Sequence, residues 1–376
     1  MWILTYRQFR HNAGRTALMV LAIGAVVSEI LILEGFLAGM YAQLRSTVLN
    51  RGGDLVLTQA GISNFIAVRS ILPQLTRLDV EDVAGVKVAH PLTAMSAIYD
   101  RDGRKTPIII LVFDDAGGPT NIILGNPISG DREIIIDKSL AKKYGFAVGD
   151  PIEISDFTFT IAGISANSSA FFTPFAFINY DDLIDFYLES EVAADIATFP
   201  FLSFLLVDIE PGADLREVAQ RIEDSVAAAD VFLPDQLAQK DEAMGRDLLG
   251  PILGLLLFVS YTIGALVVGM FMFTAVRARM RSIGVLKALG FGPAALSMAV
   301  FSEAWVLTLL AIPVGIVLAI AIASVITTIA PVYLILAAEP AAIARTTLAF
   351  LAVAGLGAIA PIRQILQVDP AIVFRG

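Results

Sequence analysis

Four long segments of the chain contain almost no charged side chains: residues 17–38, 249–276, 295–330 and 341–360. A helix needs roughly 20 residues to cross a hydrocarbon core about 30 Å thick, and each segment is long enough. Between the first two, at about residues 41–247, short apolar runs alternate with polar turns, as in a soluble α/β domain. The pattern therefore predicts four transmembrane helices and one large soluble domain.

The distribution of basic residues predicts the side of the membrane that each segment occupies. Basic residues gather at three places: Arg7, Arg10 and Arg15 before the first apolar run, Arg277, Arg279, Arg281 and Lys287 after the second, and Arg363 and Arg375 near the C-terminus. Short segments rich in lysine and arginine stay in the cytoplasm, so residues 41–247 are predicted to lie outside. Arg345, at the outer end of the fourth apolar run, is a basic residue on the predicted outer side, but the basic residues on the predicted cytoplasmic side are more numerous.

The predicted fold class is thus an α-helical membrane protein with four transmembrane helices plus a mixed α/β extracytoplasmic domain. The predicted segments are a cytoplasmic N-terminal tail (1–16), transmembrane helix 1 (17–40), the extracytoplasmic domain (41–247) with a small β subdomain at about 128–166, transmembrane helix 2 (248–276), a cytoplasmic helix (277–294), transmembrane helix 3 (295–330), an outer turn (331–340), transmembrane helix 4 (341–360) and a cytoplasmic tail (361–376).

Turn residues divide the outer domain into short elements. Asp102-Gly103 predicts a hairpin turn before the apolar strand Pro107–Phe113. A helical stretch is predicted over Ile71–Val83, and a β-α-β unit over Phe204–Leu233. Within that unit Asp214 has the residue type and position of a helix N-cap.

Composition narrows the possible functions. The chain is 56 % hydrophobic and 16 % charged, with no cysteine and two histidines. These counts exclude thiol catalysis, disulfide bonds and cysteine-ligated zinc, and two histidines are too few for a His-based metal cluster. No G-x-x-x-x-G-K-[ST] phosphate-binding motif occurs, so this chain is expected to bind no cofactor and to have no ATPase activity of its own. The first apolar run exceeds the roughly 7–15 residues of a signal-peptide core, so we expect a retained helix.

Three features of the outer domain are candidates for chemistry or binding. Asp114-Asp115 and Asp181-Asp182 are acidic pairs without metal-ligand spacing, which predicts solvated strand-end and helix-start carboxylates. Ser168-Ser169 has no histidine partner in the sequence, so a hydrolase triad has little support. The aromatic run 171–177 has two interpretations, core packing or an exposed apolar patch for a lipid or a partner.

Three acidic residues fall within the apolar segments: Glu29, Glu34 and Glu303. A charge at membrane depth is costly, and such residues are functional hypotheses by default. Counting along the helix predicts that Glu34 is interfacial and that Glu29 faces a helix bundle or a dimer cleft. Glu303 is expected to be a structural residue of the bundle near the cytoplasmic side.

The predicted cytoplasmic helix has an apolar stripe. Met280, Ile283, Leu286 and Leu289 recur at helical spacing, and Gly290 then ends the helix. Such a helix can lie along the membrane interface or in a groove of a partner. The residues alone leave both interpretations open.

Motifs along the chain resemble those of the MacB/FtsX/LolC-type (FtsX-like) permeases of ABC transporters, with a shape most similar to the DevC-like export permeases. Arg281-Ser282-Ile283-Gly284-Val285-Leu286-Lys287-Ala288-Leu289-Gly290 resembles the family signature "E-I-G-x-L-[RK]-A-x-G", which follows a basic run. Ser282 stands where the family usually has glutamate. Ser302-Glu303-Ala304 is similar to the glutamate-alanine pair that the family has early in its third helix. The C-terminal Asp369-Pro370 and Arg375 are similar to the family's terminal "L-D-P-x-x-A-L-R".

The resemblance implies a non-catalytic permease subunit, in the bacterial cytoplasmic (inner) membrane, that works by mechanotransmission. It implies a separate cytoplasmic ABC ATPase that binds ATP and Mg, a second permease copy, contact with membrane lipid, and a membrane-fusion or other envelope protein as a further partner. No nucleic-acid partner is expected. The residues that it assigns to ATPase coupling are Met280, Arg281, Ile283, Gly284, Leu286, Lys287, Ala288, Leu289 and Gly290.

Two alternative functions remain open at this point. One is an FtsX-like transmembrane regulator that activates an extracellular cell-wall hydrolase by the same motion. The other is an ion-coupled transporter that uses Glu29 and Glu303. Association with an ATPase separates the second alternative from the other hypotheses.

Overall fold

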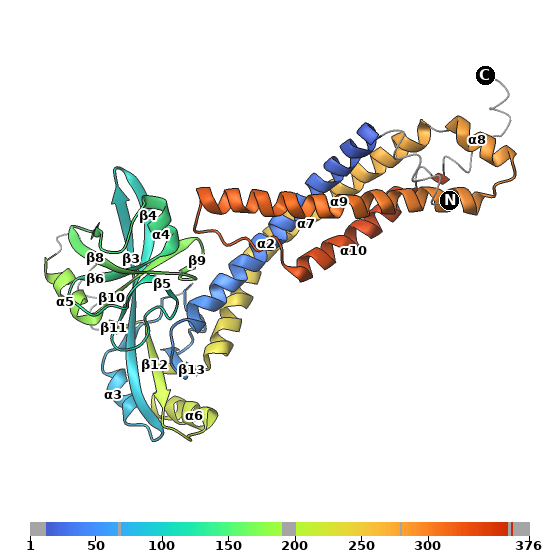
Figure 1. Cartoon of the computed structure of the whole chain (residues 1–376). Helices are drawn as coiled ribbons and strands as arrows, with labels where there is room; N and C mark the ends of the chain where they lie inside the picture. The colour runs from blue at the N-terminus through green and yellow to red at the C-terminus, as the bar shows by residue number, and fades with distance from the viewer. Residues whose placement is uncertain (1–12, 67–68, 190–200, 279, 360–361, 364–376) are drawn as a thin grey trace. The chain divides into compact units, whose positions relative to one another are not determined.

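The computed structural model describes residues 13–66, 69–189, 201–278, 280–359 and 362–363 (Figure 1). The chain divides into two compact units. The membrane unit comprises residues 1–38, 250–326 and 335–376, and the outer unit comprises residues 39–249 and 327–334. Part of the predicted N-terminal tail, Arg279 and the C-terminal residues Asp369, Pro370 and Arg375 lie outside the described residues.

Within the described residues, four helices are long and apolar enough to cross a membrane. They are α2 (Ala13–Leu49), α7 (Pro234–Arg277), α9 (Pro293–Ile329) and α10 (Pro340–Gly357), and the short helix α8 (Met280–Ala288) follows α7. Together with the mixed α/β sheet of the outer unit, they confirm the predicted fold class. α2 and α7 extend past their apolar segments, because the polar residues that flank those segments remain helical.

Glycines allow close helix packing in the membrane unit. A Cβ atom added to Gly24 of α2 would lie 3.1 Å from Val314 Cγ1 of α9, and one added to Gly315 of α9 would lie 2.5 Å from Val27 Cγ1 of α2. In lipid, helices associate through such close van der Waals contact rather than through the hydrophobic effect. Val27 is fully buried in the apolar core of this unit.

The outer unit is built on one mixed sheet. Its strands are β1 (Leu55–Gln59), β3 (Val86–Arg101), β4 (Arg104–Phe113), β5 (Ile122–Gly125), β6 (Glu133–Asp137), β7 (Pro151–Ile154), β8 (Phe157–Ser165), β9 (Ser169–Ala170), β10 (Thr173–Asn179), β12 (Phe204–Ile209) and β13 (Ala229–Phe232). β2 (Leu72–Pro73) and β11 (Phe201–Leu202) form a separate pair. The outer unit's own helices are α3 (Thr76–Glu81), α4 (Lys138–Tyr144), α5 (Tyr180–Glu189) and α6 (Leu215–Ser225).

The predicted β subdomain at 128–166 is not a sheet of its own. The strand order β13-β1-β12-β3-β4-β10-β6-β8-β5 joins its strands to the rest of the outer unit. The link is β10, which pairs in parallel with β4 and antiparallel with β6. The sequence does not indicate this link, because β10 follows the predicted subdomain in the chain and was not counted as part of it.

The β3–β4 hairpin confirms the turn predicted at Asp102-Gly103. Both residues have positive φ, 55° and 76°, as the two-residue type I′ turn requires. The strands pair from Leu92 opposite Phe113 to Arg101 opposite Arg104. β3 is a single long strand of 16 residues.

One helix prediction is wrong and one strand–helix–strand prediction is confirmed. The segment Ile71–Val83 forms strand β2 and then only the short helix α3, because Pro73 removes a backbone N–H and biases the preceding residue toward extended structure. In the predicted β-α-β unit, β12, α6 and β13 follow in order. Asp214 caps α6 by accepting hydrogen bonds from the backbone N–H groups of Arg216 and Glu217 at 2.9 and 3.1 Å.

The aromatic run 171–177 is divided between a turn and the core. Phe175 and Phe177 are buried in β10, which confirms core packing for these two residues. Phe171 and Phe172 form the β9–β10 turn with positive φ values of 45° and 64°. The Phe172 ring contacts the Tyr333 ring edge-on at 5.2 Å, so this turn packs against the segment that joins α9 to α10.

The segment between α9 and α10 crosses α2 at glycines. A Cβ atom added to Gly39 would lie 1.8 Å from the carbonyl oxygen of Leu334, and one added to Gly35 would lie 2.7 Å from the nitrogen of Ala337. One turn beyond Gly39, Gln43 donates hydrogen bonds to Ser169 Oγ at 3.0 Å and to the carbonyl oxygen of Val332 at 2.9 Å. The outer turn is therefore held by backbone contacts on one face of α2.

Candidate functional site

Helix α8 carries the residues that the sequence assigns to ATPase coupling. Most of its apolar stripe faces the protein and not the surroundings. Met280, Ile283 and Leu286 pack against the apolar core of the membrane unit. The sequence could not indicate this, because a stripe of this spacing fits a protein core and a partner surface equally well. Gly284 is buried on the same helix.

A second face of α8 is exposed and apolar. Leu289 is 71 % exposed and Val285, one turn earlier, is 42 % exposed. Ser282, at the departure from the family signature, and Ala288 are exposed as well. Gly290 adopts a positive φ of 90° and ends the helix. Val285 of α8 and Leu289, directly after it, are therefore large apolar side chains that remain available to a partner.

The carboxylate of Glu34 is neutralised within the membrane unit. Its Oε2 accepts hydrogen bonds from Arg345 Nη2 at 2.6 Å and Nε at 3.1 Å, and Tyr261 donates to Oε1 at 3.2 Å. The side chain of Glu34 is 9 % exposed and that of Arg345 is 60 % exposed. Arg345, which contradicts the charge rule for orientation, is thus the counterion of Glu34. Because the pair links α2 to α10, we assign it a structural role.

The other two intramembrane acids have different surroundings. Glu29 is exposed on the chain surface, and its Oε1 accepts a hydrogen bond from Ser260 of α7 at 3.0 Å. Glu303 is 7 % exposed in α9, next to the core residue Ala304. The three acids therefore do not share one environment.

A buried arginine lies directly after α2 in the outer unit. Arg51 is 1 % exposed, its Nε donates to the carbonyl oxygen of Thr47 at 3.0 Å, and its guanidinium lies 4.6 Å from the centre of the Phe177 ring. Its Nη1 and Nη2 have no hydrogen-bond partner among the described residues. Burial lowers the pKa of Arg51 to about 9, so the side chain remains charged at neutral pH. The charge ties the end of α2 to the aromatic face of β10.

Asp137 is the buried acid whose charge partly compensates that of Arg51. It caps α4: its Oδ1 accepts from the backbone N–H of Ser139 at 2.8 Å, and its Oδ2 accepts from that of Ser168 at 3.1 Å. Burial raises the pKa of Asp137 above its ordinary value of 3.8. The carboxylate is therefore a structural anchor between α4 and the segment before β9.

Replacing Asp137 with alanine should destabilise the protein by about 2–4 kcal/mol, because two buried N–H groups lose their acceptor. Asp137→Asn keeps one acceptor and should cost less. A raised folded-state pKa also means that the contribution of this group falls as pH rises through that pKa. Thermal unfolding in detergent at several pH values checks both, and an Asn variant with the wild-type pH dependence would contradict the assignment.

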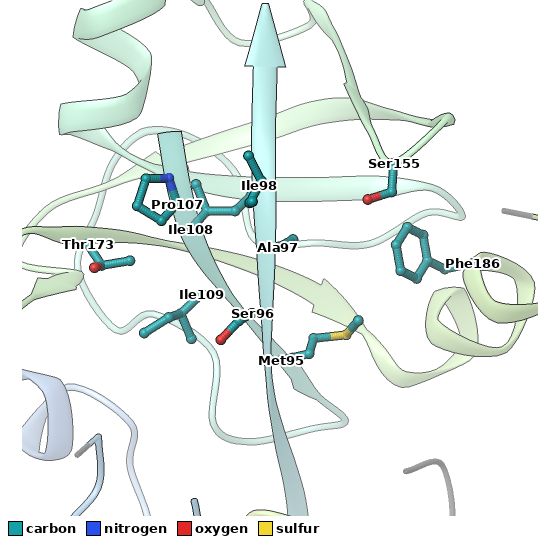
Figure 2. A pocket seen from close by; sticks show the side chains of 10 residues that line it. All are labelled: Met95, Ser96, Ala97, Ile98, Pro107, Ile108, Ile109, Ser155, Thr173 and Phe186. Atoms are coloured by element: carbon teal, nitrogen blue, oxygen red, sulfur yellow. The ribbon is translucent and has the colours of Figure 1, made fainter. Parts of the chain in front are cut away.

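The outer unit also contains an open pocket of about 550 Å³ (Figure 2). Its lining comes mainly from the β3–β4 hairpin, with Phe186 of α5 and Ser155 added from other elements. Seven lining residues are apolar and three carry hydroxyl groups, and none is ionisable. Such a lining suits an uncharged apolar molecule and supplies no acid or base for catalysis.

One residue of the acidic pairs, Asp182, is buried. Asp182 is 3 % exposed, and its Oδ1 accepts from the backbone N–H of Arg132 at 2.7 Å. It therefore connects the start of α5 to the turn before β6, whereas the sequence predicted a solvated carboxylate. In the described ranges, no group of three or more His, Asp and Glu side chains is arranged to hold a metal ion.

These features define an integral membrane protein with one large extracytoplasmic domain. The family model of the MacB-like periplasmic core domain matches residues 16–225, and that of the FtsX-like permease C-terminal domain matches residues 254–370. The chain belongs to this MacB- and FtsX-like family of ABC transporter permeases.

Curated relatives match along their whole length. The uncharacterized ABC transporter permease Rv2563 of Mycobacterium tuberculosis is 23 % identical over 379 residues, and Rv0072 of the same species is 22 % identical over 391 residues. Each match covers 100 % of both chains.

Two solved structures are similar to the outer domain. The extracellular domain of the noncanonic ABC-type transporter YknZ from Gram-positive bacteria is 13 % identical with a TM-score of 0.34, and it matches 48 % of this chain and 100 % of its own. The periplasmic region of MacB from Actinobacillus actinomycetemcomitans is 11 % identical with a TM-score of 0.36, covering 53 % of this chain and 97 % of its own.

Proposed function

We propose that this chain is the membrane subunit of an ABC transporter that works by mechanotransmission in the bacterial cytoplasmic membrane. A separate ATPase subunit binds ATP and Mg and acts on α8. α2 and α7 carry the resulting displacement to the outer domain, which exports or extrudes a substrate. A second permease copy completes the assembly.

The observation that carries the proposal is the exposed apolar face of α8. Val285 and Leu289 are exposed, while Met280, Ile283 and Leu286 attach the same helix to the membrane core. The basic residues around α8 favour the cytoplasmic side, where an ATPase would be. A helix attached on one face and exposed on the other can receive a force from a soluble partner.

The continuity of two helices supports transmission of that force. α2 is one helix of 37 residues and α7 one helix of 44 residues, and each contributes residues to both units. In the outer unit, Arg45 of α2 forms salt bridges with Asp235 and Glu242 of α7 at 3.3 and 3.4 Å. Neither helix has a loop between its apolar and outer segments, and Pro251 removes one main-chain hydrogen bond of α7 at this junction.

The test is the double variant Val285→Asp/Leu289→Asp. Burying a valine or leucine side chain contributes about 1.5–3 kcal/mol, so losing both should weaken ATPase binding at least about 100-fold. We expect the tagged full-length variant to insert and fold but to purify without its ABC ATPase. Mass spectrometry of the purified complex and vanadate-sensitive ATP hydrolysis measure this.

The matched control is Leu75→Asp/Leu78→Asp in the outer unit, where both leucines are also exposed, by 71 % and 57 %. This variant should keep the ATPase. If the α8 double variant also keeps it, α8 is not the coupling surface. Purification of the wild type without any ATPase would favour the ion-coupled alternative, and an ATPase together with an extracellular hydrolase would favour the regulator.

A further inference from the structure

Four basic residues of the outer unit lie near Tyr144 in the β3–β4 hairpin and in α4. Arg101 and Arg104 form the last pair of the β3–β4 hairpin, and Lys142 and Lys143 lie in the last turn of α4. All four are exposed. We call these four residues the basic patch.

The patch is held in place by contacts within the outer unit. Arg101 Nη1 donates to the carbonyl oxygen of Tyr144 at 3.2 Å, and Tyr144 Oη donates to that of Arg104 at 2.9 Å. Lys143 Nζ donates to Thr106 Oγ1 at 2.8 Å. The hairpin and α4, which carry the positive charges, are therefore fixed to each other.

None of the four bases forms a salt bridge with a described residue, whereas five other arginines of the outer unit do: Arg45, Arg77, Arg132, Arg221 and Arg246. On the hairpin, Asp100 is paired with Lys105 in the sheet register, which places both on the opposite face. Asp102 lies in the turn itself. A concentration of free positive charge in a domain of net charge −15 calls for an anionic partner.

One contact relates the patch to the outer surface of the membrane. Lys142 Nζ donates to the carbonyl oxygen of Thr327 at 3.4 Å. Thr327 lies in the last turn of α9, close to the outer end of the uncharged segment 295–330. Lipid phosphates occupy this level of a bilayer.

We propose that the basic patch binds the phosphate of an anionic lipid headgroup in the outer leaflet. The guanidinium groups and the ammonium groups supply charge-assisted hydrogen bonds to phosphate oxygens. This lipid contact is independent of the ATPase coupling proposed above.

The test uses the purified full-length protein in an uncharged detergent, with phosphatidylglycerol or phosphatidylcholine added. We expect phosphatidylglycerol to raise the Tm and to remain bound in native mass spectrometry, while phosphatidylcholine does neither. The variant Arg104→Gln/Lys142→Gln/Lys143→Gln should bind phosphatidylglycerol roughly tenfold or more weakly, because three charges are lost. High salt should weaken the wild-type response.

The matched control is Arg69→Gln/Lys87→Gln/Arg216→Gln, which removes three exposed charges elsewhere on the outer unit and should respond as wild type. A Lys142→Arg/Lys143→Arg variant keeps the charges and should also bind, which excludes misfolding as the cause. An equal response of the patch variant and the control would overturn the proposal. Protection by inorganic phosphate would instead indicate a free anion, and protection by polyglutamate alone an acidic protein.

Discussion

A chain that carries Gly39→Ala should assemble its outer turn poorly and unfold at a much lower temperature than the wild type. The new methyl group would lie 1.8 Å from the carbonyl oxygen of Leu334 and 2.6 Å from its carbonyl carbon. Overpacking typically costs about 1–3 kcal/mol, and here a backbone segment must move rather than a side chain. We therefore expect a loss of about 3 kcal/mol or more, measured as thermal unfolding of the purified protein in detergent.

Gly14→Ala is the matched control in the same helix, because a Cβ atom there meets nothing within 4 Å. Alanine has a higher helix propensity than glycine by about 1 kcal/mol, so this variant should be neutral or slightly more stable. If Gly39→Ala were as stable as Gly14→Ala, the close crossing of the outer turn over α2 would be wrong.

The second large effect is expected from Arg345→Leu, because it leaves the carboxylate of Glu34 buried without its counterion. Breaking a buried ion pair in this way costs about 3–5 kcal/mol. Glu34→Leu should cost less, since the side chain of Arg345 is 60 % exposed and can extend toward the membrane surface. Thermal unfolding of both single variants measures this asymmetry.

The double variant Glu34→Leu/Arg345→Leu should recover most of the lost stability, because neither charge is then unpaired. Glu339→Gln is the control, since this nearby acid caps α10 without a side-chain hydrogen bond and its loss should be nearly neutral. Additive losses in the double variant would show that Glu34 and Arg345 do not act as a pair.

The features that the sequence predicted are those with a local physical signal. Uncharged segments of about 20 residues define the four apolar helices. Asp102-Gly103 defines the hairpin turn, because both positions require positive φ and the residues tolerate it. Asp214 defines the start of α6, because its carboxylate satisfies free N–H groups of the first turn.

The features that were missed depend on partners distant in sequence. Arg345 is 311 positions from Glu34. Counting charges could therefore place Arg345 at the outer end of the fourth apolar run, but could not show that it pairs with Glu34. The sequence around Arg51 does not indicate that it is buried, because its aromatic neighbour Phe177 lies far along the chain, in β10. The direction of the α8 stripe depends on a core formed by other helices. Only the Gly35-x-x-x-Gly39 spacing offered a usable signal, since small residues four apart allow close packing in membranes.

The crossing of the outer turn over α2 has a consequence for which substitutions this family can accept. The closest contacts at Gly35 and Gly39 are made to main-chain atoms of Leu334, Leu336 and Ala337, and Leu336 also donates its N–H to the carbonyl oxygen of Gly35 at 2.9 Å. Main-chain atoms are the same for every residue type. Selection should therefore hold the two glycines nearly invariant, whichever residue types stand at positions 334 and 336.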